Sequence, residues 1–181
     1  MNSSDLIRVI QEQARPLIEG LYSELRTNLG TSHYHRLSNE ELFRRGQAVY
    51  QHLAEWLNSR DAAAVHGSGV ELGKKRFSEG IPLGQVVLAL ILEEKHLWDY
   101  LSTQDLPVGE KLRLEVTEFF ARTIYSTSLG YEESLAERNR KAQRAVVPPQ
   151  PVGADAPQAG STKEKQEISA SRGGQVGEFG G

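Results

Sequence analysis

Apolar residues recur every three or four positions through the first 145 residues, and this spacing predicts five helices. In the first of them, over residues 4–28, leucine and isoleucine follow one another mostly at every fourth position. Pro16 lies inside this segment, where a proline removes one backbone donor and clashes with the carbonyl four residues earlier. We therefore expect the first helix to be kinked or split near residues 13–15.

The second helix has a clear start signal. A loop around residues 33–37 leads to Ser38, whose hydroxyl can cap a helix while Glu41, three residues later, reciprocates. The apolar face that follows ends before Asn58 and Ser59. The pattern predicts a helix over residues 38–59.

The third helix, over residues 61–79, contains three glycines, at Gly67, Gly69 and Gly73. Each glycine in a helix interior costs about 1 kcal/mol relative to alanine. We therefore expect a weakened helix with a break near Gly67.

The fourth helix, over residues 82–102, follows a glycine-proline hinge. Gly80 can take a positive φ that ends the preceding helix, and Pro82 has its φ preset for a first helical turn. Residues 86–92 are all apolar, but this run is far shorter than the roughly 20 residues that cross a bilayer, and charged residues follow at once. We expect this helix at the centre of a bundle.

The fifth helix is expected to open at Pro107 and to run to about residue 145. Its apolar stripe comprises Leu112, Val116, Phe120, Ile124, Ser128 and Tyr131. Beyond Glu132 the stripe thins and acidic residues precede basic ones. Glu137 and Lys141 have the i,i+4 spacing of an ion pair, and cations gather near the helix C-terminus. This solvated end is the candidate interaction surface, formed by Glu137, Arg138, Arg140, Lys141 and Arg144.

After Val147 the composition changes to proline, glycine, alanine, serine and glutamine with scattered charge. Such a segment cannot bury enough apolar surface to offset the entropy of ordering it. The sequence therefore predicts a helical domain over residues 1–145 and a disordered tail over residues 146–181.

The segment from Leu72 to Leu101 resembles the helical N-terminal sensor domain of RsbR-type regulators, the RsbT co-antagonists of bacterial stress signalling, which also precedes some sensor histidine kinases. The residues that carry the resemblance are Gly73, Arg76, Gly80, Pro82, Leu83, Val86, Val87, Leu90, Leu97 and Trp98. The resemblance implies an all-α, globin-like bundle without haem, a homodimer, and a regulatory role. In that family an output domain follows, whereas nothing foldable follows Ala145 here. We therefore expect either a separate output protein or a protein that only modulates partners.

The composition limits which classes of partner and which cellular compartment we expect for this protein. The formal net charge is −3 and basic residues are spread along the chain, which argues against nucleic acid as a partner. There is no cysteine, so disulfides and thiolate chemistry are excluded. The first residues lack the basic and apolar regions of a signal peptide. We expect a cytoplasmic protein that contacts no membrane.

Two histidine patterns are the candidate cofactor sites. Glu93 and His96 have the i,i+3 spacing of di-iron bundles, but such a site needs the motif twice, and the nearest other pair, His52 and Glu55, is reversed. We expect Glu93 and His96 at the rim of the bundle instead. The sequence His33-Tyr34-His35 lacks a nearby third ligand and is expected to be an ordinary loop.

Haem is the alternative hypothesis, because one axial histidine suffices and His66 and His96 both fall on helices. Under that hypothesis the protein is a haem- or iron-binding helical sensor held by His96. A small helical enzyme ranks below both, since no nucleophile motif or phosphate loop is present. The expectation that we carry forward is a non-catalytic sensory or regulatory domain without cofactor or metal, with the first and last helices forming a dimer interface.

Overall fold

Six α-helices and one 3-10 helix make up the part of the chain that the computed structural model describes, residues 1–104 and 106–146, and this part contains no strand. The all-α class is therefore confirmed. The expected count of five helices is wrong, for local reasons given below. The predicted tail over residues 146–181 lies outside the described residues, apart from the backbone of Val146.

The first predicted helix is split, as expected from its proline. Helix α1 spans Ser3–Glu12 and α2 spans Ala14–Thr27, with the non-helical Gln13 between them at φ −117° and ψ 23°. Pro16 is the third residue of α2, in the first turn, where no helical hydrogen bond is lost. The expected kink at residues 13–15 is confirmed as a break at Gln13.

The segment predicted as a loop is instead a 3-10 helix, η1, over Leu29–Arg36. Thr31 explains its order, because the buried hydroxyl donates to the carbonyl of Leu25 at 2.7 Å. Helix α3 then spans Asn39–Ser59, and Ser38 caps it by accepting from the Glu41 amide at 3.1 Å, as predicted. The Glu41 side chain pairs with Arg44 and Arg45 instead of returning to the Ser38 amide, so the reciprocal half of the predicted capping box is wrong.

Helix α4 spans Ala62–Ser78 without a break, so the expected interruption near Gly67 is wrong. The reason is the close crossing of α4 and α6, which needs residues without side chains. A Cβ on Gly73 would overlap the Thr127 carbonyl oxygen, and a Cβ on Gly130 would overlap that of Val70. Packing against α6 therefore compensates for the low helix propensity of these glycines.

Helix α5 spans Leu83–Thr103 and follows the predicted hinge, in which Gly80 has φ 72°. Its buried face includes Val86, Leu90, Leu97 and Leu101. The apolar run is not buried all round, because Ile91 is 47% exposed. The helix that was expected at the centre of the bundle is therefore buried on one face and partly exposed on another.

Helix α6 spans Glu110–Val146 and begins three residues after the predicted start at Pro107. Leu112, Val116 and Phe120 are buried as expected, but the burial then moves to small residues. Thr123, Ser126, Thr127 and Gly130 are buried, whereas Ile124, Ser128 and Tyr131 are only half-buried. The shift follows from the α4 crossing, where small side chains let the two backbones approach.

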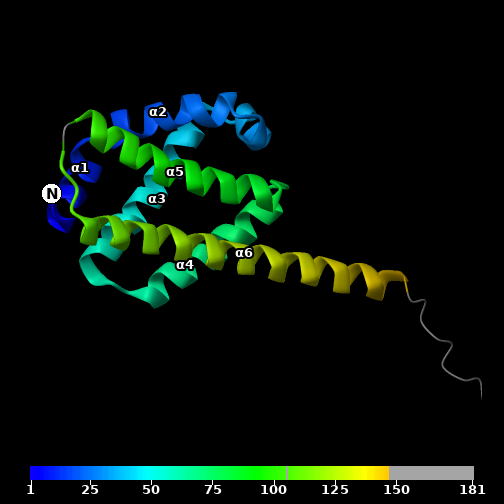
Figure 1. The fold of residues 1–181 in the computed structure, drawn as a ribbon. Helices are drawn as coiled ribbons and strands as arrows, with labels where there is room; N and C mark the ends of the chain where they lie inside the picture. The colour runs from blue at the N-terminus through cyan, green and yellow to red at the C-terminus, as the bar shows by residue number, and fades with distance from the viewer. Residues whose placement is uncertain (105, 147–181) are drawn as a thin grey trace, which may run out of the picture. The chain divides into compact units, whose positions relative to one another are not determined.

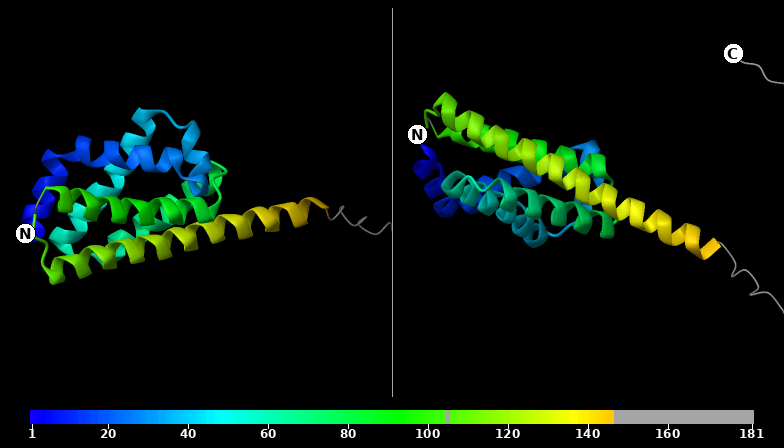
Figure 2. Two further views of the ribbon diagram at one scale, coloured as in Figure 1. Left: turned by 45° about the horizontal axis from the view of Figure 1, so that its top comes forward. Right: turned by 90° about the horizontal axis from the view of Figure 1, so that it is seen from below.

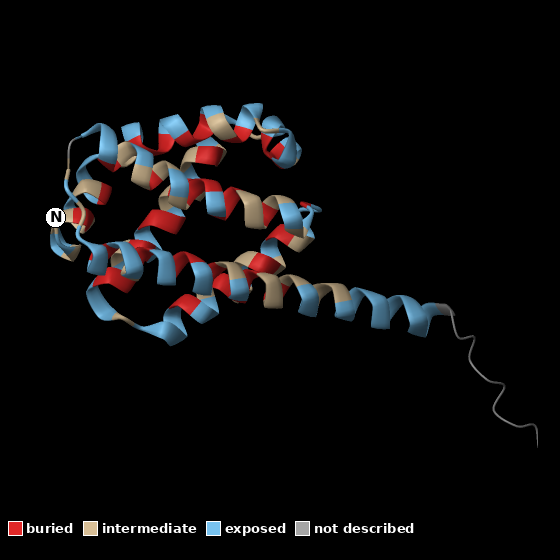
Figure 3. Cartoon of the chain, in the orientation of Figure 1, coloured by how far each residue is buried: buried red, intermediate tan, exposed pale blue. Residues whose placement is uncertain are grey.

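Figures 1 and 2 show how these helices surround the core. Helix α5 lies between α2 and α6, α3 crosses behind them, and α4 runs along α6. Helix α6 continues past the end of the other helices, and Figure 3 shows that the last part of this continuation, residues 136–145, is exposed. One helix therefore joins the buried core to a free surface.

Candidate functional site

The predicted interaction residues all lie on the exposed continuation of α6. Glu137 and Lys141 form the expected i,i+4 ion pair at 2.6 Å, and Lys141 lowers the pKa of the Glu137 carboxyl. Arg138 stacks over the Phe77 ring of α4 at 5.0 Å, and Phe77 packs edge-on against Tyr131. The remaining basic residues, Arg140 and Arg144, are exposed.

The candidate histidines lie apart from one another. The His96 ring packs on the backbone of α2, so closely that a Cβ on Gly20 would lie 2.6 Å from Nε2. Burial lowers the pKa of His96, although the charges of Glu24 and Asp99 oppose this. His66 contacts the Ser126 hydroxyl at 3.1 Å, and His52 contacts Glu55 at 3.2 Å on the surface of α3.

In η1, His33 and His35 have separate polar contacts. The His33 amide donates to the Gln85 side chain at 2.9 Å, and a ring nitrogen of His35 lies 3.0 Å from the Asn28 carbonyl. Across residues 1–104 and 106–146, no cluster of three or more histidine, cysteine, aspartate or glutamate side chains is arranged to hold a metal ion.

Glu93 is not at the rim of the bundle, where it was expected, but in the core, with only 6% of its surface exposed. Desolvation raises the pKa of its carboxyl to about 8, although the Arg76 charge opposes the shift. Its Oε2 has no hydrogen-bond partner among the described residues, and its backbone carbonyl accepts from the Tyr50 hydroxyl at 3.0 Å. Glu93 and His96 thus face different neighbours and do not form one site.

The spacing did contain a signal for this burial. Val86, Leu90, Glu93, Leu97 and Leu101 follow one another at three- and four-residue steps and share one helix face. Arg76 likewise continues the buried face of α4 that carries Val65, Gly69 and Gly73. In both cases the position on the apolar stripe, and not the charge of the side chain, indicates the burial.

An ion-pair network, which we call the arginine ladder, connects α3 to the end of α4. Arg45 Nε lies 2.6 Å from Glu41, and Arg45 Nη1 lies 3.0 Å from Glu79 without good hydrogen-bond geometry. Arg76 donates to the same Glu79 at 3.0 Å, and Arg44 pairs with Glu41 at the outer end. The side chains of Arg45 and Arg76 are only 11% and 8% exposed, so these two arginines are largely shielded from water, whereas Arg44 is 67% exposed.

The arginine ladder borders a cavity of about 310 Å³, which we call the arginine cleft. Helices α3, α4 and α6 form it. Its lining is Arg44, Arg45, Ala48, Val49, His52, Ser68, Gly69, Glu71, Leu72, Lys75, Arg76, Phe119 and Thr123. The lining combines four cationic side chains, of Arg44, Arg45, Lys75 and Arg76, with apolar side chains such as Phe119, and this combination suits an amphipathic anion.

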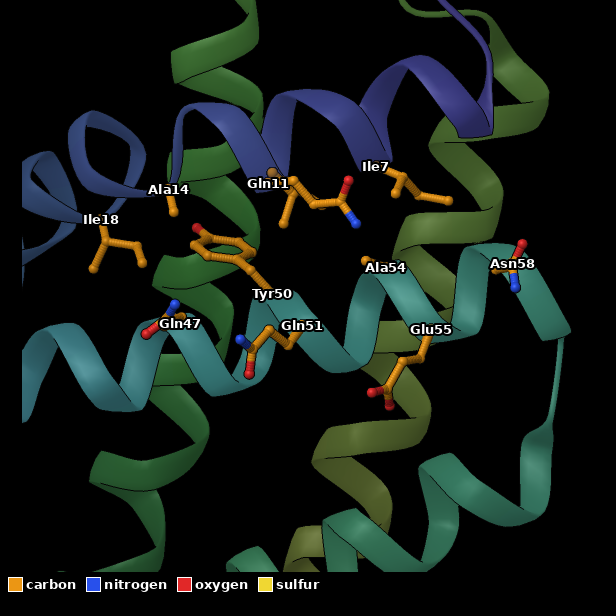
Figure 4. Close-up of a pocket in the computed structure, with 11 residues that line it drawn as sticks. Ile7, Gln11, Ala14, Ile18, Gln47, Tyr50, Gln51, Ala54, Glu55 and Asn58 are labelled. Atoms are coloured by element: carbon orange, nitrogen blue, oxygen red, sulfur yellow. The ribbon is translucent and has the colours of Figure 1, made fainter.

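A second and larger hollow, of about 790 Å³, lies between α1, α2 and α3. Figure 4 shows Ile7, Ala14, Ile18 and Ala54 beside the amide side chains of Gln11, Gln47 and Gln51 along this groove. Tyr50 also lines this groove, and its hydroxyl donates to the Glu93 carbonyl. The groove carries little charge, and its polar groups are mostly neutral.

None of the helices in the described part of the chain is both long enough and apolar enough to cross a membrane. Comparisons with protein-family models, with curated proteins and with solved structures return no match for this chain. The geometry of α6 and of the arginine cleft therefore carries the functional argument.

Proposed function

We propose that residues 1–145 form a stand-alone sensory or regulatory input domain of bacterial stress or two-component-type signalling. In this proposal the domain is a globin-like bundle that acts by protein contact and without catalysis. Its output partner is a separate protein that binds the exposed end of α6. The resemblance of the segment around Gly73, Gly80 and Pro82 to RsbR-type sensor domains motivates the class of function.

The observation that carries this proposal is the continuity of α6. The helix is 37 residues long, its first half is packed in the core, and its second half is exposed and charged. A change in packing at Thr123 or Gly130 would therefore move residues 137–144 as a rigid extension. That is the property needed to pass a signal from the bundle to a partner.

The proposed mechanism is a shift between two packings of α6, in a homodimer, that alters how its end is presented. Two large apolar side chains exposed on α6, Leu114 and Tyr125, are 64% accessible and lie three turns apart on one face. The expected contribution of the first helix to the dimer interface has less support. In the described part of the chain, none of the exposed large apolar residues lies on α1 or α2.

Exchange of charge on the α6 end tests the proposal. The full chain is used to capture its partner, and capture is repeated with the double variant Arg140→Glu and Arg144→Glu. The matched control, Arg36→Glu with Lys111→Glu, makes the same charge change at exposed sites on the bundle. We expect the first variant to lose the partner while its thermal midpoint is unchanged. Equal capture by both variants would contradict the proposal.

A further inference from the structure

The arginine cleft combines charge and shape in a way that the proposed contact through α6 does not use. Two arginines that are nearly buried stand beside an accessible cavity rather than in a closed core. We propose that this cleft is a binding site for a small organic monocarboxylate with an apolar body, such as an arylalkanoic acid. The carboxylate would lie toward Arg45, Arg76 and Lys75, and the apolar body toward Phe119.

The charges around the cleft can be balanced by one bound anion. The arginine ladder contains three guanidinium groups, from Arg44, Arg45 and Arg76, and two carboxylates, from Glu41 and Glu79. It therefore has one positive charge in excess, and a carboxylate would form charge-assisted hydrogen bonds with it. Because the Arg45 and Arg76 side chains are mostly shielded from water, they interact with an anion more strongly than a surface arginine would.

Two further residues adjust the charge at the mouth. Lys75 is exposed there and pairs with no carboxylate in the described part of the chain. Glu71 also lines the cleft, and Lys74, 3.3 Å from Glu71, is shared with Glu133 at 3.5 Å. Lys74 and Lys75 together offset these two carboxylates, so the net charge around the cleft is the one excess positive charge of the arginine ladder, which would attract an anion.

The apolar part of the lining selects an apolar body. Val49, Leu72 and Phe119 form this part, and a volume of about 310 Å³ is at the small end of ligand pockets. Thr123 adds one polar atom, a buried Oγ1 that has no hydrogen-bond partner among the described residues.

Thr123 also connects the cleft to α6, because it lies one turn before the buried Ser126 and Thr127 at the α4 crossing. That the bound acid is the input signal rests on the proposed regulatory function. The binding itself does not, since it depends only on the cleft. A binding measurement without a partner therefore separates the two.

Isothermal titration calorimetry on the full chain, with hydrocinnamate as the probe, tests the site. The uncharged hydrocinnamamide, which has the same apolar body, is the ligand control. We expect the acid to bind at least about tenfold more tightly than the amide, because only the acid meets the excess cation. Absence of acid binding, or equal binding of the amide, would overturn the proposal.

Variants locate the binding on the protein. Lys75→Gln should weaken hydrocinnamate binding about threefold or more. Arg45→Lys should also weaken it, because lysine lacks the planar guanidinium group that donates two parallel hydrogen bonds to a carboxylate. Lys111→Gln is the matched control, since Lys111 is 92% exposed and does not line the cleft. If Lys111→Gln and Lys75→Gln both bind the acid as tightly as the unaltered chain, the acid lies elsewhere and the assignment is wrong.

Discussion

At the scale of single residues, Glu93 shows how a charged side chain can belong to the core. It occupies a position of the buried stripe of α5, and its neighbours provide only partial compensation, from the Arg76 charge. Without a direct hydrogen-bond partner for Oε2, the carboxyl group is more stable in its neutral, protonated form. The consequence is a stability that depends on pH.

Unfolding at several pH values tests this consequence. The folded state holds the Glu93 proton up to about pH 8, whereas the unfolded chain releases it near pH 4.5, so stability falls as pH rises through this window. His96 has a lowered pKa and acts oppositely, but only below about pH 6.5. Between pH 6.5 and 8 we expect a loss approaching about 1.4 kcal/mol per pH unit.

The variant Glu93→Gln should remove this slope, because glutamine stays neutral throughout. Glu94→Gln is the control, since Glu94 is half-buried and already accepts a hydrogen bond from the Thr117 hydroxyl at 2.7 Å. Urea denaturation at each pH gives the free energy of unfolding. A slope that persists in Glu93→Gln would show that another group is responsible.

Leu90 and Ile91 provide a second test on neighbouring residues of α5. Leu90 is 3% exposed, so Leu90→Ala should leave a cavity and lower the free energy of unfolding by about 2 to 5 kcal/mol. Ile91→Ala is the matched control at a site that is nearly half exposed, and we expect a loss of about 1 kcal/mol or less. Similar losses in the two variants would mean that α5 is rotated from the orientation described.

At the scale of helices, the sequence predicted what depends on local signals. The break near Pro16, the Ser38 cap and the positive φ of Gly80 each follow from the chemistry of one or two residues. Two other features do not follow from local chemistry: the continuity of α4 and the burial of Thr123 on α6. Both depend on the crossing of two helices that are distant in the chain.

The candidate site divides in the same way. The charged end of α6 can be found from its spacing, and the Glu137–Lys141 pair was predicted correctly. The arginine cleft could not be found in this way, because Arg45, Lys75 and Phe119 come from three helices. Only tertiary packing brings these residues together, and no short motif records it.

The α4–α6 crossing predicts that its glycines cannot be replaced. Gly73→Ala should lower the free energy of unfolding by about 1 to 3 kcal/mol, because the methyl group would push against the backbone of Thr127. Gly67→Ala is the matched control on the same helix, since a Cβ there meets nothing within 4 Å. It should stabilise the protein by up to about 1 kcal/mol. Chemical denaturation distinguishes the two, and equal effects would contradict the close crossing.

At the scale of the whole molecule, the first question is whether the segment after Ala145 contributes to folding. Its composition predicts that it does not, because it has few residues able to form a core. Truncation after Ala145 should therefore leave the thermal midpoint of unfolding nearly unchanged. A decrease of several degrees would show that residues 146–181 dock on the helical domain.

The last prediction is that the protein is a homodimer without haem or metal. Leu114 and Tyr125 share an exposed face of α6, and burial of such a face against a second copy would remove apolar surface from water. Light scattering coupled to size exclusion should give twice the monomer mass, and an absorption spectrum of the same sample should show no Soret band.

Two charge insertions locate the interface. Leu114→Glu with Tyr125→Glu should shift the protein to the monomer, because each glutamate would have to be desolvated in the pair. Leu29→Glu is the control, since Leu29 is 90% exposed and lies in η1, away from that face. A monomer at tens of micromolar in the unaltered chain would remove the proposed mechanism. A Soret band that disappears in His96→Ala would instead favour the haem-sensor hypothesis, in which a bound cofactor, and not a rearranged dimer, starts the signal that α6 transmits.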